Sequence, residues 1–156
     1  MTIERTFDLL ENLRNNHNRE DILAAKREGQ WVKFSAEDYS RTSKRFSYGL
    51  LAGGFKKGDK IATVSNNRPE WNMADMGMAM IGAIHVPIYP TIGDDEYRHI
   101  LEHSDARLLI VSDKALYSRL KPIADSIPGI ENVYTFNYYE DAPHWSEITK
   151  LGEQNR

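Results

Sequence analysis

The chain has 156 residues, of which 40% are hydrophobic and 28% are charged, and its formal net charge is -3. This length and this balance predict one globular domain with a hydrophobic core, and they leave too little chain for two ordinary domains. The small negative charge gives no electrostatic case for nucleic acid or an anionic membrane as a partner, and the absence of cysteine excludes a disulfide framework and a thiol nucleophile.

Residues 3–34 predict a helix followed by a hairpin. Apolar residues recur at helical spacing over residues 3–16, which indicates an amphipathic helix; they are Ile3, Phe7, Leu10 and Leu13. Two strand-like pieces follow, at residues 22–26 and 31–34, with Glu28-Gly29 between them. Two short strands around such a glycine-containing pair are typical of a β-hairpin.

A second helix is predicted from residue 36 onward. Ser35 and Asp38 have the spacing of a capping box, in which the two side chains bond to each other's backbone N–H groups. Gly53-Gly54 is the expected end, because glycine readily adopts the left-handed conformation that follows many helices. The residues of this helix that we expect to be buried are Tyr39, Phe46, Leu50 and Leu51.

The stretch from Lys57 to Thr91 predicts a β–α–β unit with a parallel pair of strands. Residues 61–64 form a short apolar run that suits a covered strand, and residues 84–89 form the next strand. Asn67 is the expected cap of the intervening helix, with Pro69 in its first turn, where a missing N–H costs little.

The helix at residues 70–81 is apolar on two sides. One stripe consists of Trp71, Ala74, Met78 and Ile81, and the other consists of Met73, Met76 and Met80. A helix that is apolar on two sides is buried on two sides, so we expect Trp71 in the interior. A methionine face that the rest of the chain leaves open would favour self-association, and a homo-oligomer is therefore expected.

Residues 93–150 continue the alternation of helices and strands. Strands are predicted at 107–111 and 132–136, and helices are predicted from Gly93, from Ser112 or Asp113 through Ala124, and around Trp145. The apolar stripes of these helices are Tyr97, Ile100 and Leu101, then Leu116, Leu120 and Ile123, and finally Ile148. Altogether the pattern predicts a layered α/β fold, with a mostly parallel sheet flanked by helices, right-handed crossovers and a small N-terminal hairpin.

Ligands of open α/β sheets sit at the carboxyl ends of the strands. The candidate positions are therefore Ser65–Asn67, Tyr89–Thr91, Ser112–Lys114 and the chain from Asn137 onward. Asn66 and Asn67 precede a helix, so backbone N–H groups there could hold an anion, or the asparagines could simply cap the helix. Tyr89 and its two successors line a pocket or merely end a strand at proline.

The chain shows no catalytic constellation. His99 and His103 are four residues apart on one helical face, which suits either a metal or a solvated pair, and no glutamate stands in the H-E-x-x-H position. His85 lies in a strand, as a base or as a packed residue with a hydrogen-bond partner. Asp94, Asp95 and Glu96 are neighbouring carboxylates, but at a helix start they complement the helix dipole. We therefore predict no catalytic, cofactor-binding or metal-binding residue in this chain.

Three ordered segments resemble the adenylate-forming enzymes, in particular the AMP-forming long-chain fatty-acid–CoA ligases. They are GDKIATVSNNRPEW (58–71), IGAIHVPIYPT (81–91) and EYRHILEHSDARLLIVSD (96–113), and FSAEDYSRTSKRFSYGLLAGGFKKGD (34–59) resembles the helix that precedes them. The resemblance extends from about residue 20 to about residue 135. It implies a ligase that uses ATP, magnesium and coenzyme A to activate a fatty acid as an acyl-adenylate and then form the thioester.

The resemblance also implies what this chain lacks. The family's phosphate loop, [ST]-S-G-[ST]-T-G-x-P-K-G, is absent, as are its adenine motif and its C-terminal domain with the catalytic lysine. Residues 1–156 are therefore expected to form a single α/β unit, the first part of the large N-terminal domain, and to be inactive alone. The expected location is the cytoplasm, with room for peripheral membrane association of the full-length enzyme. The alternative is a free-standing α/β binding module without catalytic activity.

Overall fold

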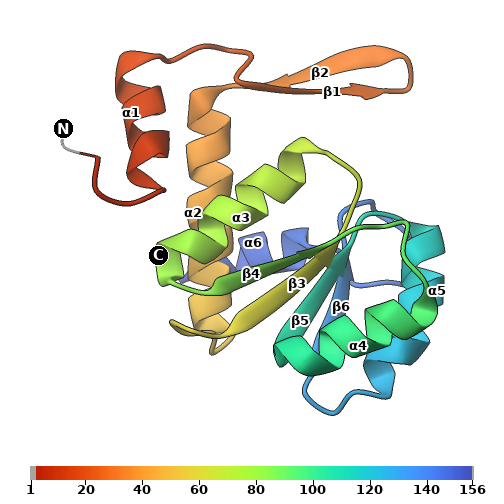
Figure 1. Cartoon of the computed structure of the whole chain (residues 1–156). Coiled ribbons are helices and arrows are strands. Elements are labelled where there is room, and N and C mark those ends of the chain that lie inside the picture. The colour runs from red at the N-terminus through yellow and green to blue at the C-terminus, as the bar shows by residue number, and fades with distance from the viewer. Residues whose placement is uncertain (1–2, 156) are drawn as a thin grey trace. The chain divides into compact units, whose positions relative to one another are not determined.

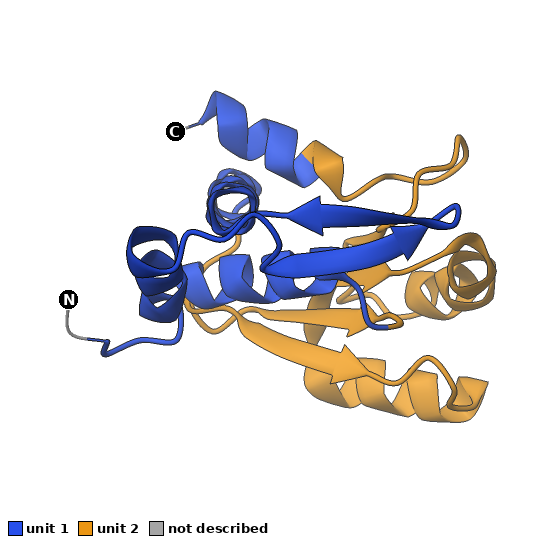
Figure 2. Cartoon of the chain, turned by 90° about the horizontal axis from the view of Figure 1, so that it is seen from above, with its two compact units in different colours: residues 1–54, 67–81, 148–156 blue, residues 55–66, 82–147 orange. Residues whose placement is uncertain are grey.

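The computed structural model describes residues 3–155, and its helices and strands follow one another as the sequence predicts (Figure 1). Its contacts divide the chain into two compact units (Figure 2). Unit 1 contains the residues through Gly54, residues 67–81 and the residues from Ile148 on, and unit 2 contains residues 55–66 and 82–147. Each unit is described by itself. The expectation of a single unit over residues 1–156 stays a prediction.

Unit 1 begins with α1 (Asp8–Asn16), which starts later than the predicted helix. Residues 3–7 form bends and turns instead, and the Ile3 side chain is exposed. The reason is Asp8, whose carboxylate accepts hydrogen bonds from the backbone N–H groups of Glu4 and Arg5 at 3.2 and 2.9 Å. An acidic side chain that binds the preceding N–H groups holds them outside the helix, so the apolar period at Ile3 was misleading.

The predicted hairpin is confirmed. Strands β1 (Leu23–Arg27) and β2 (Gln30–Phe34) pair in antiparallel fashion, with Arg27 opposite Gln30 next to the turn. The two turn residues have positive φ, 50° at Glu28 and 82° at Gly29. A two-residue turn with both φ values positive matches the twist of the strands, which explains why glycine is needed there.

Helix α2 (Ala36–Ala52) has the predicted capping box. The Ser35 hydroxyl accepts from the Asp38 N–H at 3.0 Å, and the Asp38 carboxylate accepts from the Ser35 N–H at 3.1 Å. Burial of Tyr39, Phe46 and Leu50 is confirmed, and the helix ends before Gly53 and Gly54 as expected. The prediction for Leu51 is wrong, because its side chain is 51% exposed.

Helix α3 (Pro69–Ile81) packs against α2 within unit 1. The two helices approach each other closely at Gly77, where an added Cβ would lie 2.8 Å from the Phe46 ring and from the Ser43 carbonyl oxygen. Helix α3 begins at Pro69, so Arg68 rather than Asn67 directly precedes it. The prediction of an interior Trp71 is wrong, since its side chain is only half-buried.

The methionines of α3 are better covered than the sequence suggested. Met73 and Met78 are buried, and Met76 and Met80 are half-buried. The open methionine face on which the expected self-association depended is therefore not found on α3. The homo-oligomer itself stays a prediction.

The last helix, α6 (Ser146–Gln154), contributes its residues from Ile148 onward to unit 1. It meets α2 at two glycines. A Cβ on Gly49 would lie 1.8 Å from the Ile148 carbonyl oxygen, and a Cβ on Gly152 would lie 1.8 Å from the Arg45 carbonyl oxygen. The two backbones therefore touch directly, and neither position has room for any side chain.

Unit 2 is built on a four-stranded parallel sheet of order β4–β3–β5–β6. Its strands are β3 (Lys60–Val64), β4 (Ile84–Ile88), β5 (Ala106–Val111) and β6 (Asn132–Thr135), and its helices are α4 (Asp94–Ser104) and α5 (Lys114–Asp125). The predicted parallel sheet is thus confirmed, and each strand lies within one or two residues of its expected place.

The core of unit 2 follows from the period-two pattern of its strands. Alternate side chains of the strands join one cluster with the stripes of α4 and α5; its buried strand members are Ala62, Val64, Ile88, Ala106, Leu109, Val111 and Val133. Tyr97, Leu101 and Leu120 are fully buried in this cluster, as the helical periodicity predicts. The alternate side chains Ile61, Leu108 and Ile110 are also buried, so both faces of the sheet are covered, as is usual for parallel sheets.

Candidate functional site

The carboxyl ends of the parallel strands bring several of the predicted positions to one edge of unit 2. The Ser112 N–H donates to the Val64 carbonyl at 3.0 Å, and the Asn137 N–H donates to the Ser112 carbonyl at 3.1 Å. These bonds join the ends of β3, β5 and β6 just where the chain leaves the sheet. Ser65, Ser112 and Asn137 therefore share an edge, as predicted, whereas Asn67 belongs to unit 1.

Most polar side chains at this edge are engaged in local structure. The Ser112 hydroxyl donates to the Asp113 carboxylate at 2.9 Å, and that carboxylate also accepts from the Leu116 N–H at 3.0 Å. Asp113 is thus the N-cap of α5, one of the two residues expected there. The Ser65 hydroxyl donates to the Asn66 carbonyl at 2.7 Å. Groups held in this way position the backbone but offer little to a reacting substrate.

Tyrosines supply the exposed surface of the same edge. Tyr89 follows β4 and is 80% exposed, while its carbonyl accepts a 3.1 Å hydrogen bond from the hydroxyl of buried Tyr97. Tyr138 follows β6 and is 78% exposed. These two rings are available to cover a ligand or another part of a larger protein.

The chain after β6 contributes contacts that the sequence did not indicate. Tyr139 meets Tyr117 edge to face at 5.9 Å, and burial together with the negative charge of Asp113 raises the pKa of Tyr139 to about 12. His144 lies 2.8 Å through Nε2 from the Phe136 carbonyl and 2.7 Å through Nδ1 from the Ser146 hydroxyl. The tyrosine therefore stays protonated at neutral pH, and the histidine fixes the loop to the strand end.

The start of α3, in unit 1, already contains a negative charge. Glu70 lies in the first turn, where it forms ion pairs with Arg27 and, at 2.9 Å, with Arg68. Burial alone would raise the pKa of Glu70, but the hydrogen bond and charge of Arg68 and the charge of Arg27 lower it overall. An internal carboxylate at a helix N-terminus competes with any external anion, so the anion site considered at Asn66 and Asn67 gains no support.

The contacts of three of the histidines bear on the alternatives that the sequence left open. His85 Nε2 lies 2.8 Å from the Thr63 hydroxyl, which confirms the packed residue with a hydrogen-bond partner. His99 and His103 stack with ring centroids 5.8 Å apart on the exposed side of α4. Within residues 3–155 no group of three or more potential ligands gathers as a metal site would require. The absence of metal-binding residues stays a prediction.

The carboxylates of Asp94, Asp95 and Glu96 lie in the first turn of α4, where the helix dipole favours negative charge. Glu96 accepts from the Gly93 N–H at 2.7 Å, and Asp94 forms an ion pair with Arg119 at 2.5 Å. Each of these two carboxylates therefore has a partner within unit 2.

The helices of residues 3–155 include none long and apolar enough to pass through a bilayer.

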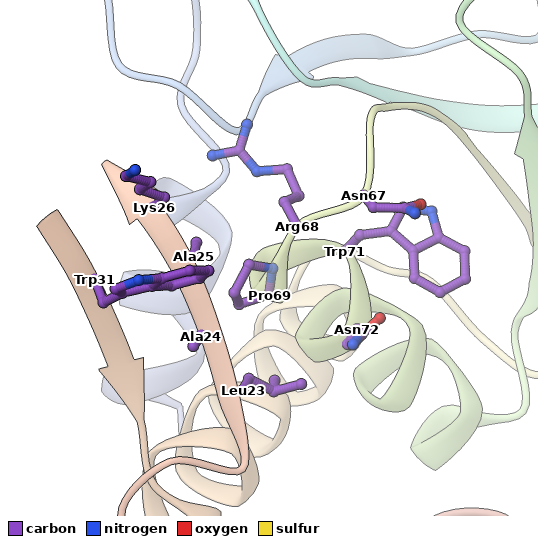
Figure 3. A pocket seen from close by; sticks show the side chains of 10 residues that line it. All are labelled: Leu23, Ala24, Ala25, Lys26, Trp31, Asn67, Arg68, Pro69, Trp71 and Asn72. Atoms are coloured by element: carbon purple, nitrogen blue, oxygen red, sulfur yellow. The ribbon is translucent and has the colours of Figure 1, made fainter. Parts of the chain in front are cut away.

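Unit 1 contains a pocket of about 670 Å³ between β1 and the first turn of α3 (Figure 3). Its lining combines two tryptophans, two cationic residues and two asparagines with small and apolar residues: Leu23, Ala24, Ala25, Lys26, Trp31, Asn67, Arg68, Pro69, Trp71 and Asn72. The sequence did not indicate this pocket, because the two lining segments lie about forty residues apart. Trp71 is one of the lining residues, and its side chain is half-buried.

Known proteins share both the sequence pattern and the fold. The sequence model of a family described as AMP-binding enzyme matches residues 11–153. A long-chain-fatty-acid–CoA ligase, FadD15 of Mycobacterium bovis, is 26% identical over 121 residues, which cover 75% of this chain and 20% of that protein. A crotonobetaine/carnitine–CoA ligase of Citrobacter koseri is 29% identical over 137 residues, or 80% of this chain and 26% of that protein.

A solved structure extends the similarity to three dimensions. The crystal structure of a long-chain-fatty-acid-CoA ligase (FadD1) from Archaeoglobus fulgidus matches with a TM-score of 0.79 and 21% identity, covering 97% of this chain and 31% of that one. At this identity the match concerns the fold. The chain spans between a fifth and a third of the length of these three proteins.

Proposed function

Because this chain belongs to the AMP-binding enzyme family, we propose that it is part of a ligase. This ligase activates a long-chain fatty acid and transfers it to coenzyme A. The observation that carries the proposal is the family match over residues 11–153, which includes nearly every element of both units. The name of the Mycobacterium bovis relative supports the substrate class. Localisation in the cytoplasm is part of the same proposal.

The proposed reaction has two steps. A carboxylate oxygen of the fatty acid attacks the α-phosphorus of ATP, so that pyrophosphate leaves and an acyl-adenylate forms. The thiol sulfur of coenzyme A then attacks the acyl carbon, and AMP leaves as the thioester forms. Both steps need groups that stabilise phosphate charge, which backbone N–H groups and cations usually supply.

Three observations support a scaffold role for this chain. No phosphate loop occurs in the sequence, Glu70 occupies the start of α3, and residues 3–155 contain no cluster of ligands for magnesium. We therefore assign no chemical step to a residue of this chain. Its proposed role is to supply the parallel sheet and its covering helices as a scaffold for the rest of the ligase.

The test is an assay of the complete open reading frame that contains this chain. We expect release of pyrophosphate and formation of acyl-CoA when the purified protein receives Mg-ATP, coenzyme A and fatty acids of 12 to 18 carbons. Crotonobetaine and carnitine should be assayed as alternative substrates, because one relative is named as a ligase for these two acids. Activity only with those acids would remove the long-chain assignment and keep the reaction class.

The coding sequence beyond Arg156 separates the ligase from the free-standing binding module. A reading frame that continues into a serine-, threonine- and glycine-rich phosphate loop is expected. A stop codon at that point, together with no pyrophosphate release, would contradict the ligase proposal.

A further inference from the structure

The outer edge of β1 is the most distinctive unassigned surface of unit 1. The hairpin is a sheet of two strands, so each strand has one edge without a partner strand. Four consecutive residues of β1, Leu23 to Lys26, line the 670 Å³ pocket. Successive side chains of a strand point to opposite faces, so four in a row can line one pocket only along the edge of the strand.

The register shows which backbone groups this edge presents. Arg27 and Gln30 flank the two-residue turn and therefore exchange hydrogen bonds, as do Ala25 and Val32 two residues further on. The residues between them on β1 alternate with these pairs. The N–H and C=O groups of Ala24 and Lys26 consequently point away from β2 and toward the pocket.

The volume of the pocket is similar to the volume that one added strand would occupy. Strands lie about 4.8 Å apart in a sheet, sheets pack about 10 Å apart, and a strand rises about 3.3 Å per residue, so four residues fill about 600 Å³. This volume is close to the 670 Å³ of the pocket. Figure 3 shows β1 between β2 and the first turn of α3, so an added strand would lie between β1 and the turn that contains Pro69.

The charges and the aromatic side chains indicate what kind of strand fits. Lys26 and Trp31 are directly opposite each other and share the outer face of the hairpin, where Lys26 is exposed and Trp31 is 67% exposed. Glu70, the acidic residue closest in sequence to the pocket-lining turn, is held by two arginines. A second copy of β1 would bring its own Lys26 and Arg27 to this cationic edge, whereas a strand with carboxylates would complement it.

We propose that the edge of β1 binds an extended acidic peptide strand, which adds to the hairpin as a third strand. Its backbone would pair with Ala24 and Lys26, and its carboxylates would approach Lys26 on the outer face. Its alternate, apolar side chains would lie on the opposite face, beside Leu23 and Ala25 of β1. Strand addition of this kind combines main-chain hydrogen bonds with side-chain pockets, and it gives a two-stranded hairpin the third strand that stable sheets normally have.

The test uses isotope-labelled chain and the synthetic peptide Ac-Glu-Val-Glu-Val-Glu-NH₂, followed by amide chemical shifts. We expect the largest changes at Ala24 and Lys26. Ala24→Pro removes an outward N–H that takes no part in the hairpin ladder, so the hairpin should remain folded while the peptide binds about tenfold more weakly. Ala24→Ser is the matched control, with unchanged binding.

Charge is tested separately with Lys26→Gln and with the lysine peptide Ac-Lys-Val-Lys-Val-Lys-NH₂. The acidic peptide should lose affinity for Lys26→Gln, and the lysine peptide should bind the original chain at least tenfold more weakly than the acidic one. Equal binding of both peptides, or equal losses in Ala24→Pro and Ala24→Ser, would overturn the proposal. Concentration-dependent shifts at Ala24 without peptide would also overturn it, because they would make a second copy the occupant.

Discussion

The contacts that stabilise unit 1 internally differ from those that stabilise unit 2. In unit 2, large side chains from neighbouring strands and helices fill one cluster, and each of its segments lies close to the next along the chain. Unit 1 collects three distant segments, and two of its helices meet through bare backbone at Gly49 and Gly152. Burial in unit 2 therefore follows from the periodicity of its side chains, whereas direct backbone contact in unit 1 depends on where a side chain is missing.

The largest expected effect is loss of side-chain volume in unit 2. Leu109 lies in β5 and is fully buried, with 0% of its surface accessible to solvent. Leu109→Ala should therefore leave a cavity in the core of unit 2. We expect a loss of about 2–5 kcal/mol in the free energy of unfolding, measured by a denaturant titration. A loss below about 1 kcal/mol would mean that the cluster is loosely packed.

Unit 1 should respond to added volume instead. In Gly152→Ala the new Cβ would lie 1.8 Å from the Arg45 carbonyl oxygen, and backbone cannot move aside as a flexible side chain can. We expect a loss of about 3 kcal/mol and faster amide exchange in α6. Gly129→Ala is the control, because nothing lies within 4 Å of its added Cβ. Equal stability of the two variants would contradict the close contact of α2 with α6.

Trp71 should have a smaller effect than a core aromatic residue. Full burial would predict a loss of about 3–5 kcal/mol for Trp71→Ala. Because the side chain is half-buried at a pocket, we expect about half of that, roughly 2 kcal/mol. A denaturant titration measures the difference, and a loss above about 4 kcal/mol would restore the interior position that the helical stripe suggested.

The smallest expected effect is a pH dependence at the start of unit 1. The hydrogen bond from the Arg5 side chain, with the N–H groups of Arg5 and Glu4, lowers the pKa of Asp8 from 3.8 to about 2. A lowered folded-state pKa adds stability above the unfolded value, and this contribution is lost as the pH falls from about 4 to about 2. Asp8→Asn should lack this step in acid titrations. If the free energy of unfolding of Asp8→Asn has the same pH dependence as that of the original chain, other carboxylates cause the loss of stability in acid.

Much of unit 2 could be predicted from the sequence, and unit 1 shows why the rest could not. The stripes of Tyr97 and Leu101 and of Leu116 and Leu120 repeat at helical spacing, so local pattern was enough to place α4 and α5. The contact of Gly49 with α6 joins residues about one hundred positions apart, and no periodicity reports it. Glycine inside a helix costs about 1 kcal/mol relative to alanine. The presence of glycine at position 49 was therefore the signal in the sequence for a close contact between helices.

The candidate sites divide in the same way. Strand ends at Ser65 and Ser112 were predictable, because parallel strands place their carboxyl ends at one edge. The pocket beside β1 was not, because its lining comes from residues 23–31 and 67–72, which are far apart in the sequence. The neighbouring ion pair between Arg27 and Glu70 likewise joins residues 43 positions apart. Such an ion pair cannot be predicted from the sequence, since each of the two residues alone has the pattern of an ordinary surface charge.

The most direct test of the scaffold role is isothermal titration of the chain of residues 1–156 with Mg-ATP. The start of α3 in unit 1 is occupied by an ion pair, the start of α5 in unit 2 is capped by Asp113, and the sequence contains no phosphate loop. We therefore expect no binding tighter than a Kd of about 100 µM, which corresponds to about 5.5 kcal/mol. Saturable binding below that Kd would contradict the claim that this chain supplies scaffold rather than a nucleotide site.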